Sequence, residues 1–391
     1  MKNSGVEWIG EIPDDWEISK TKYLTKLYTG NSIKDEEKNL YEDKADAVPY
    51  ISSKDINATF STTNYENGMY VKHSDNSFVR APAGSTLMCI EGGSAGKKKT
   101  FLNQEVCFVN KLCCFSPIKI DSKFLFYCLN SPNYEEEFRF NISGMIGGVS
   151  VGKLNQFILP KPQKSTQQRI ASYLDKKCSK IEETIQNQQQ VIEKLKAYKQ
   201  SLITEAVTGK IKIQNGKVCG KYESYKDSGV EWIGKIPSEW EAIKAKYFIK
   251  ISNGSDPKTE EGDTPVYGSG AESFKTCVEF KDGPTVLIGR KGATLHIPHY
   301  IEGNYWNVDT AFDVKAYSEE ALLLKFYYYC ATAFDYKFYL TSTTLPSMTQ
   351  TNYGNMYLPV PNTQTQKEIV EYLNNKCTAI DTAIEQKQKL I

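Results

Sequence analysis

Two stretches of this sequence nearly repeat each other, and the repeat limits the fold to two copies of one unit. Residues 4–17 read SGVEWIGEIPDDWE, and residues 228–241 read SGVEWIGKIPSEWE. Over residues 3–23 and 227–247 the copies agree at 14 of 21 positions, both tryptophans included. Agreement of this kind arises from duplication. With 391 residues, the chain has room for two or three domains, each with a core of its own.

A second duplicated segment lies further along each copy. Residues 159–192 match residues 358–391, and the two segments share a leucine, prolines, a tyrosine, a cysteine and isoleucines at equivalent places. The chain therefore runs A-B-A′-B′, with a variable stretch between each A and its B. The second B segment stops at Ile391, eighteen residues short of the end that the first reaches at Lys210.

The B segments are predicted to be long helices that pair with each other. Helix-start residues at 166–168 follow Pro162, and Gly209 is a natural stop. Apolar residues alternate at spacings of four and three, which is typical of a coiled-coil seam. The seam positions predicted to pack between the helices are Leu174, Cys178, Ile181, Ile185, Ile192 and Leu195 in the first and Leu373, Cys377, Ile380 and Ile384 in the second. Gln188 and Lys199 also fall in the seam, where polar residues fix the register of a coiled coil.

The stretches between A and B are predicted to form strands and loops. Residues 24–157 and 248–356 are rich in β-branched and aromatic residues and are punctuated by Gly and Pro. A weak alignment pairs PYISSKDI with PVYGSGAE, VCFVNK with YWNVDT, and two hydrophobic strands that each lead into a glycine-rich basic loop. Ends that agree and middles that diverge are expected of two modules that share a scaffold but recognise different things. The dense aromatic runs at 327–330 and 334–339 are predicted to be core.

Composition indicates a globular protein without a membrane span or a metal centre. The net charge is +1, and no apolar run approaches the roughly 18 residues of a membrane helix. The N-terminus lacks the apolar core of a signal peptide, and the ten cysteines form no C-x-x-C pair, so we expect a cytoplasmic protein with free thiols. His296 and His299 have no Cys or acidic neighbours at ligand spacing, and we expect no metal site there.

These features together resemble the specificity subunit of type I restriction–modification enzymes. The similarity rests on Trp8-Ile9-Gly10 with Pro13 and Trp16, repeated at Trp232, Pro237 and Trp240. It also rests on LP-x-P followed by Gln168-Arg169-Ile170 and a long helix, echoed at Gln366-Lys367-Glu368-Ile369. The resemblance covers essentially the whole chain, in the order A-B-A′-B′.

The resemblance implies a DNA-binding protein that is not itself an enzyme. Two target-recognition domains would each read one half of a bipartite double-stranded DNA sequence, and the helices would set the gap and dock two methyltransferase subunits. Those partners would bind S-adenosylmethionine, and restriction/translocase subunits would use ATP and Mg. This chain would carry no cofactor.

The implied fold is α+β, with two homologous mixed α/β target-recognition domains separated by two long helices that form an antiparallel coiled coil, as an internal pseudo-two-fold repeat. We assign residues 1–160 to target-recognition domain 1 and 161–210 to spacer helix 1. Residues 211–360 form target-recognition domain 2, and 361–391 form a shortened spacer helix 2. The seam from Leu174 to Leu202 would span about 40 Å, comparable to one turn of DNA.

Two kinds of loop are predicted to contact DNA. Basic residues follow a strand and glycines in each copy, and arginine binds guanine edges while lysine more often contacts phosphates. Short hydroxyl residues follow a strand at a second place in each copy. The predicted DNA contacts are Ser52, Ser53, Lys54, Lys97, Lys98 and Lys99 in the first copy and Tyr267, Ser269, Arg290 and Lys291 in the second, with Arg290 and Lys291 as counterparts of the lysine run.

Two other classes of function compete with this interpretation. A catalytic chain is disfavoured because PDDWEISK spaces its acids and lysine wrongly for a nuclease and its repeat has lost the aspartate. EGGSAGKKKT lacks the first glycine and the Ser or Thr of a phosphate-binding loop, and SPNY lacks the acid or amide and the second proline of an amino-methyltransferase motif. The remaining alternative is a coiled-coil scaffold with two protein-binding domains.

Overall fold

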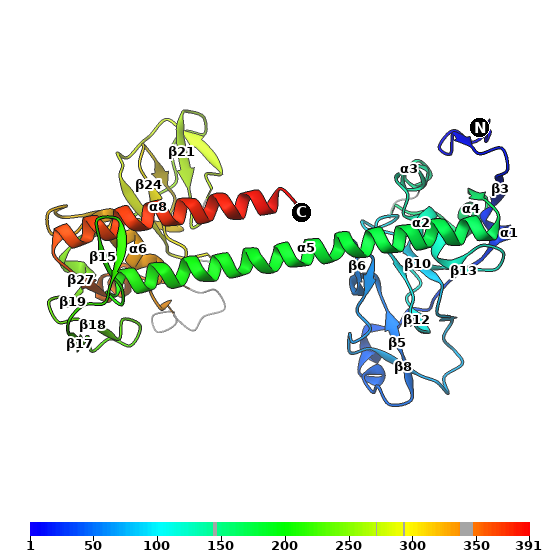
Figure 1. Ribbon diagram of the computed structural model, residues 1–391, viewed down its shortest axis with the longest axis horizontal. Coiled ribbons are helices and arrows are strands. Elements are labelled where there is room, and N and C mark those ends of the chain that lie inside the picture. The colour runs from blue at the N-terminus through cyan, green and yellow to red at the C-terminus, as the bar shows by residue number, and fades with distance from the viewer. Residues whose placement is uncertain (144–146, 271, 292–293, 337–346) are drawn as a thin grey trace. The chain divides into compact units, whose positions relative to one another are not determined.

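The computed structural model describes residues 1–391 apart from 144–146, 271, 292–293 and 337–346 (Figure 1). The chain divides into two compact units, Met1–Thr184 and Ile185–Ile391. One continuous helix, α5 (Lys164–Val207), contains the boundary between them, and a second long helix, α8 (Thr363–Gln388), ends the chain. Helix α5 starts two residues before the predicted start and ends at the predicted stop, where Gly209 has φ +70°.

The first unit is built around two four-stranded sheets. The strand order is β11-β10-β13-β4 in one sheet and β8-β5-β12-β9 in the other. The strands are β4 (Thr25–Thr29), β5 (Ala47–Ile51), β8 (Tyr70–Lys72), β9 (Arg80–Ala81), β10 (Thr86–Cys89), β11 (Lys99–Phe101), β12 (Val106–Phe108) and β13 (Leu112–Pro117). The other elements are β1 (Lys2–Asn3), β2 (Glu11–Ile12), β3 (Glu17–Lys20), α1 (Thr21–Leu24), η1 (Asp35–Tyr41), η2 (Ser53–Asp55), β6 (Ile56–Asn57), β7 (Thr62–Thr63), α2 (Ser122–Leu129), α3 (Pro132–Phe140), α4 (Val151–Leu154) and β14 (Ile158–Lys161).

The second unit repeats this arrangement. Its sheets have the orders β24-β23-β26-β20 and β22-β21-β25. The strands are β20 (Ile249–Asn253), β21 (Thr264–Tyr267), β22 (Lys275–Cys277), β23 (Thr285–Gly289), β24 (His299–Ile301), β25 (Trp306–Asn307) and β26 (Ala311–Ala316). The other elements are β15 (Lys212–Gln214), β16 (Lys217–Gly220), β17 (Tyr225–Asp227), β18 (Lys235–Pro237), β19 (Glu241–Lys244), η3 (Ala245–Tyr247), α6 (Leu324–Ala333), α7 (Gln350–Asn355) and β27 (Tyr357–Val360). The predicted duplication of a mixed α/β unit is confirmed.

The register of one parallel strand pair confirms two of the weak alignments, PYISSKDI with PVYGSGAE and VCFVNK with YWNVDT. Tyr50 of β5 lies opposite Cys107 of β12, and the aligned Val266 of β21 lies opposite Trp306 of β25. A glycine is required beside each pair. A Cβ on Gly30 would lie 1.7 Å from the Phe108 carbonyl oxygen, and one on Gly254 would lie 2.1 Å from that of Val308. The two units therefore share this close backbone approach although their side chains differ.

The duplicated opening stretch forms the same turn in both units. The amides of Ile9 and Gly10 both donate to the Val6 carbonyl, just as Ile233 and Gly234 donate to Val230. Both glycines have φ near +66°, a region that favours glycine. Behind each turn a tryptophan packs edge-to-face on an aromatic ring: Trp8 on Tyr134 at 6.1 Å and Trp232 on Phe334 at 5.2 Å. The stretch occurs twice because in each unit its tryptophan packs on an aromatic residue that follows or ends the helix α2 or α6.

A buried glutamine explains the duplicated segment at the start of each long helix. Gln167 donates from Nε2 to the Pro162 carbonyl and accepts the Asp121 amide on Oε1 at 2.7 Å. Gln366 donates to the Pro361 carbonyl and accepts the Leu323 amide at 2.9 Å. Each glutamine thus joins its long helix to the start of the shorter helix α2 or α6 and satisfies backbone groups that would otherwise be buried unpaired.

Helix α8 runs antiparallel to the second half of α5 (Figure 1). Both polar seam residues have partners: Lys199 donates to the Asp381 carboxylate at 2.8 and 2.6 Å, and Lys387 donates to Gln188 Oε1 at 3.1 Å. Of the predicted seam residues, Ile192, Leu373, Cys377, Ile380 and Ile384 are buried, and Leu195 packs against the same core. The predicted antiparallel coiled coil is confirmed over this part of α5.

The seam prediction needs a correction at Ile181, whose side chain is 58% exposed. Leu174, Cys178 and Ile185 are half-buried. The helix pairing reaches Gln188 and Lys387 close to the end of α8, so Ile181 lies one heptad beyond the last described contact between the two helices.

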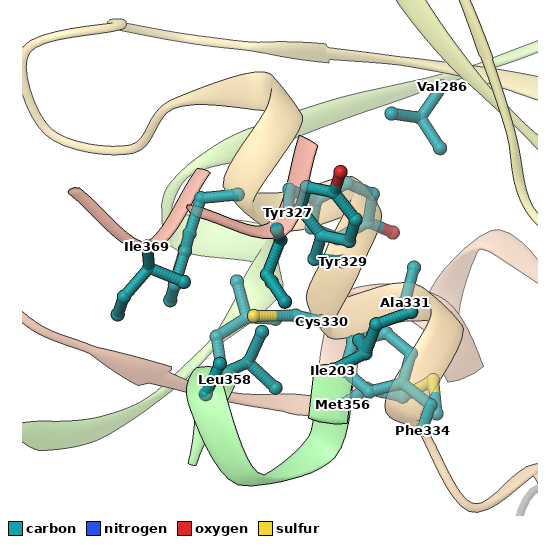
Figure 2. Packing of buried hydrophobic residues seen from close by; sticks show 14 of the residues in the cluster. Ile203, Val286, Tyr327, Tyr329, Cys330, Ala331, Phe334, Met356, Leu358 and Ile369 are labelled. Carbon is teal, nitrogen blue, oxygen red and sulfur yellow. The ribbon is translucent and has the colours of Figure 1, made fainter. Parts of the chain in front are cut away.

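The largest core lies in the second unit and contains the aromatic residues predicted to be core. Figure 2 shows part of it, with Tyr327, Cys330 and Ala331 of α6 among Leu358 of β27, Ile369 of α8 and Ile203 of α5. Phe334 and Tyr336 are also buried there, whereas residues 337–339 of the predicted aromatic run lie outside the described residues. Helix α5 thus contributes to the core of the second unit as well as to the helix pair.

Candidate nucleic-acid interface

In the first unit, the loops after three strands meet at one edge of the sheets. The Val109 amide donates to the Ile51 carbonyl at 2.9 Å, and the Ile90 amide donates to the Lys111 carbonyl at 3.0 Å. These bonds bring together the ends of β5, β10 and β12. Two of the segments predicted to bind DNA also touch, because Lys98 Nζ donates to the Ser53 carbonyl at 2.7 Å. We call this region, which comprises residues 52–54, 90–98 and 109–111, the first loop edge.

The three lysines of the predicted run have three different environments. Lys97 is exposed, and Lys98 is half-buried against Ser53. Lys99 is 1% exposed, and its ammonium donates to the Leu129 carbonyl at 2.8 Å and to Glu135 at 2.6 Å. Burial lowers the pKa of Lys99, and the Glu135 carboxylate opposes that shift. The prediction of Lys99 as a DNA contact is therefore wrong: Lys99 is a structural residue of β11 and does not reach the surface that DNA would contact.

The hydroxyl segment is also partly used by the fold. The Ser52 hydroxyl donates to Asp55 Oδ2 at 2.6 Å, and the Ser52 amide donates to the same oxygen, which forms a cap on the short helix η2. Lys54 is exposed at the tip of this turn. The sequence analysis missed Lys111, which is exposed at the same edge and whose signal was its place at the end of the repeated VCFVNK segment.

The second unit has an equivalent edge, formed by residues 267–269, 289–291 and 308–310, which we call the second loop edge. The Val308 amide donates to the Tyr267 carbonyl at 2.9 Å, and the Arg290 amide donates to the Thr310 carbonyl at 2.8 Å. Tyr267 and Ser269, both half-buried, are therefore brought to the same edge as Arg290. Thr294, which sequence analysis did not single out, donates its hydroxyl to Ser269 Oγ at 3.3 Å.

The guanidinium of Arg290 is positioned by its neighbours. Its Nη1 lies 3.4 Å from the Asp309 carbonyl oxygen, and its Cζ lies 5.9 Å from the centre of the Phe312 ring. The side chain is half-buried, and the adjacent Lys291 is exposed. A held guanidinium keeps further donors for a planar acceptor such as a guanine edge.

The predicted correspondence between Arg290-Lys291 and the lysine run is wrong. Isolated β-bridges join Glu91 to Gly148 in the first unit and Lys291 to Ser347 in the second. The backbone amides of Ile90 and Arg290 make equivalent hydrogen bonds across the edge, to the carbonyls of Lys111 and Thr310. Lys291 therefore occupies the place of Glu91, and Arg290 that of Ile90. The lysine run lies at the far end of its loop, so charge is distributed differently at the two edges.

No group of three or more His, Cys, Asp or Glu residues that could hold a metal ion occurs in the described part of the chain. His299 begins β24, where burial lowers its pKa. Among the described residues, no helix combines the length and apolar character needed to cross a membrane.

Comparison with known proteins gives one consistent family. The model of the type I restriction modification DNA specificity domain matches residues 13–197 and again residues 237–390. The specificity subunit of the type I restriction enzyme EcoBI from Escherichia coli is 24% identical over 206 residues, which are 51% of this chain and 40% of that protein. The chain thus matches less than half the length of this curated relative.

Solved structures show the same fold at low sequence identity. A chain from a structure of complex assembly and conformational transition of the type I R-M system has a TM-score of 0.71 at 13% identity, covering 97% of this chain and 94% of that one. The HsdS subunit from Thermoanaerobacter tengcongensis has a TM-score of 0.50 at 13% identity, covering 100% and 96%. With the family model matching most of both repeated units, this chain belongs to the type I restriction modification DNA specificity domain family, and it carries the domain twice.

Proposed function

We propose that this chain is the DNA-reading subunit of a type I restriction–modification complex, and that each unit reads one half of a bipartite double-stranded target. One observation carries the proposal: the two loop edges are built by the same strand pairings and the same backbone hydrogen bonds, yet they present different side chains. A shared frame with divergent loops is suited to reading two different half-sites, since sequence is read by side chains in the grooves.

The catalytic steps would belong to partner subunits. In this proposal two methyltransferase subunits, which use S-adenosylmethionine, dock on the long helices, and restriction/translocase subunits supply ATP- and Mg-dependent chemistry. The chain itself holds no cofactor. The proposal retains residues 1–160 and 211–360 as the recognition domains and 161–210 and 361–391 as the spacer helices, and places the complex in the cytoplasm with the DNA that it reads.

The proposal is tested by mapping methylated sites in cells that carry this chain with its methyltransferase partner. A bipartite motif with a fixed gap, absent when this chain is omitted, is expected. Footprinting of the complex on that motif should show two protected segments. Methylation without a bipartite motif, or a complex that binds all DNA alike, would instead favour a coiled-coil scaffold with two protein-binding domains.

Replacing Arg290 is expected to relax one base position in one half-site. Arg290→Ala should cost about 1–3 kcal/mol at that position, because a bidentate arginine contact to a base contributes that much discrimination. Lys291→Ala is the matched control, and it should weaken binding to all sequences similarly by removing a phosphate contact. Binding measurements on a panel of single-base variants check this. An unchanged preference in Arg290→Ala would exclude Arg290 from base reading.

Replacement by alanine is expected to reduce DNA affinity at Lys97 and the stability of the first unit at Lys99. Lys97→Ala should reduce DNA affinity and flatten its salt dependence without affecting stability. Lys99→Ala should destabilise the first unit by about 3 kcal/mol, because it opens a cavity and leaves the Leu129 carbonyl without its donor. Hydrogen exchange of β10 and β11 together with salt titrations of binding separates the two effects. A stable Lys99→Ala protein with reduced affinity would restore Lys99 as a DNA contact.

A further inference from the structure

One acidic side chain lies among the lysines of the first loop edge. Glu91 is exposed there, as is Lys111. Burial raises the pKa of the neighbouring Cys89, whose thiol donates to the Glu91 carbonyl at 3.3 Å. The charges of Lys98 and Lys111 lower this pKa, and the charge of the Glu91 carboxylate raises it. One negative and two positive side chains therefore lie close to the same thiol.

The Glu91 carboxylate has no partner in the part of the chain that the structure describes. Its oxygens make no hydrogen bond or ion pair with those residues, and Lys98 donates instead to the Ser53 carbonyl at 2.7 Å. Residues 144–146 lie outside the described residues; they are Gly, Met and Ile and offer no cationic side chain. The carboxylate is therefore available to a hydrogen-bond donor from outside the chain.

The backbone holds Glu91 in place from two sides. The Ile90 amide donates to the Lys111 carbonyl at 3.0 Å, and the Ile90 carbonyl accepts the Val149 amide at 3.0 Å. Glu91 itself forms a β-bridge with Gly148. A Cβ on Gly148 would lie 3.2 Å from Glu91 Cγ, so the glycine leaves room for the glutamate side chain. The carboxylate is thus presented from a fixed point of the edge.

The second unit has a cation at the equivalent place. Lys291 forms a β-bridge with Ser347 as Glu91 does with Gly148. A lysine at this place can neutralise a phosphate, whereas a carboxylate repels phosphates and weakens binding to every DNA sequence. In a unit that reads DNA, a hydrogen bond from a base would offset this repulsion. An ionised carboxylate only accepts hydrogen bonds, so the base must be the donor.

The donor pattern of the major groove selects one base. Only adenine N6 and cytosine N4 donate there. Adenine N6 lies between two acceptors, its own N7 and O4 of the paired thymine. Cytosine N4 has an acceptor on one side only, O6 of the paired guanine, and C5–H on the other. A carboxylate has two acceptor oxygens, so it meets less repulsion at cytosine than at adenine.

We propose that Glu91 reads a cytosine in the half-site of the first unit by accepting a hydrogen bond from its N4 amino group in the major groove. This inference rests on the proposed function and adds to it one specificity-determining residue and the base that it selects. The half-site of the first unit then contains a C·G pair. Glu91 opposes DNA binding in general and favours it at that pair.

The test measures binding of the complex of this chain with its methyltransferase partner to duplexes that carry the mapped motif, with each base pair varied in turn. Glu91→Ala should reduce the preference for one C·G pair by about 5- to 150-fold. It should also bind duplexes that lack this pair more tightly than the unmodified chain does, because a charge that repels phosphates is gone. Glu91→Gln should accept adenine at the same position, since an amide pairs with adenine N6 and N7.

Two controls accompany these variants. The half-site that Arg290→Ala alters should be read unchanged by both Glu91 variants, which shows that the complex remains folded. Glu36→Ala removes another exposed carboxylate of the first unit, outside the first loop edge, and should change no base preference.

A modified duplex tests the contact without changing the protein. N4-methylcytosine at the selected position replaces the amino hydrogen that faces the groove. It should weaken binding of the unmodified chain by a similar factor and leave Glu91→Ala unaffected. A first half-site without a C·G pair, an unchanged preference in both variants, or an equal effect of the methyl group on both proteins would overturn the inference. In each case the bipartite motif itself remains, whereas failure of the proposed function would remove it.

Discussion

Duplicating residues 182–188 within helix α5 is expected to widen the gap between the two half-sites by about 3 base pairs while leaving the half-sites themselves unchanged. Helix α5 is continuous from Lys164 to Val207, and seven added residues lengthen it by about 10 Å. At roughly 3.4 Å per base pair this corresponds to about 3 base pairs. A heptad preserves the phase of the 4-3 seam, and the duplicated segment again ends in a glutamine opposite Lys387.

The measurement is the genome-wide methylation pattern in cells that carry the lengthened chain and its methyltransferase partner. The matched control inserts seven Gly and Ser residues at the same place, which breaks the helix and should abolish a defined gap. The lengthened helix should still pair with α8, because Ile192, Leu195 and Lys199 keep their partners. Altered half-sites with the original gap would show that the helix does not set the spacing.

Lys281→Met is expected to destabilise the second unit by about 3–5 kcal/mol, because it leaves a buried carboxylate without its partner. Asp313 is 6% exposed, and Lys281 lies 2.5 Å from it while also donating to Asn307 Oδ1 at 2.8 Å. Asn307 belongs to β25, which leads into the second loop edge. Loss of this lysine should therefore also weaken reading of one half-site, and not of the other.

A second substitution separates the cost of an unpaired charge from the value of the pair. The double variant Lys281→Met/Asp313→Leu should recover most of the stability, because replacing a buried ion pair by apolar groups is often nearly neutral. Lys250→Met, at an exposed position of the neighbouring strand β20, is the control and should change stability by less than about 0.5 kcal/mol. Hydrogen exchange of β23 and β26 reports on the second unit alone. Equal losses in the single and double variants would contradict the explanation.

The parts of the fold that follow from a local or repeated sequence pattern could be predicted from the sequence. The 4-3 spacing predicted both long helices, and Gly209 marked the end of the first. The weak alignments at 49–56 and 106–111 located strand ends that the structure brings together at the first loop edge. Helices and strands can be predicted in this way because the spacing of apolar residues shows which face of each element is buried, whatever the other side chains are.

The roles of individual site residues could be predicted less well. Lys97, Lys98 and Lys99 are identical in type and adjacent, but Lys99 starts a strand whose pairing with β10 directs its side chain inward, while Lys98 turns to Ser53. Successive side chains of a strand point to opposite faces, and which face is interior depends on the neighbouring sheet and helices. Likewise, the bridges from Glu91 and Lys291 show that two basic loops matched by composition are not equivalent in position.

By itself the sequence determined that this chain is one unit written twice, that each copy ends in a seam-forming helix, and that the copies differ in their loops. Tertiary structure alone decided which seam residues are covered. Ile380 is 8% exposed and Ile181 is 58% exposed, although both occupy the same place in the same repeated pattern. Periodicity specifies a face to be buried, whereas burial requires a second surface. Helix α5 supplies that surface to α8 around Lys199, and the described contacts between the two helices reach Gln188, one heptad short of Ile181.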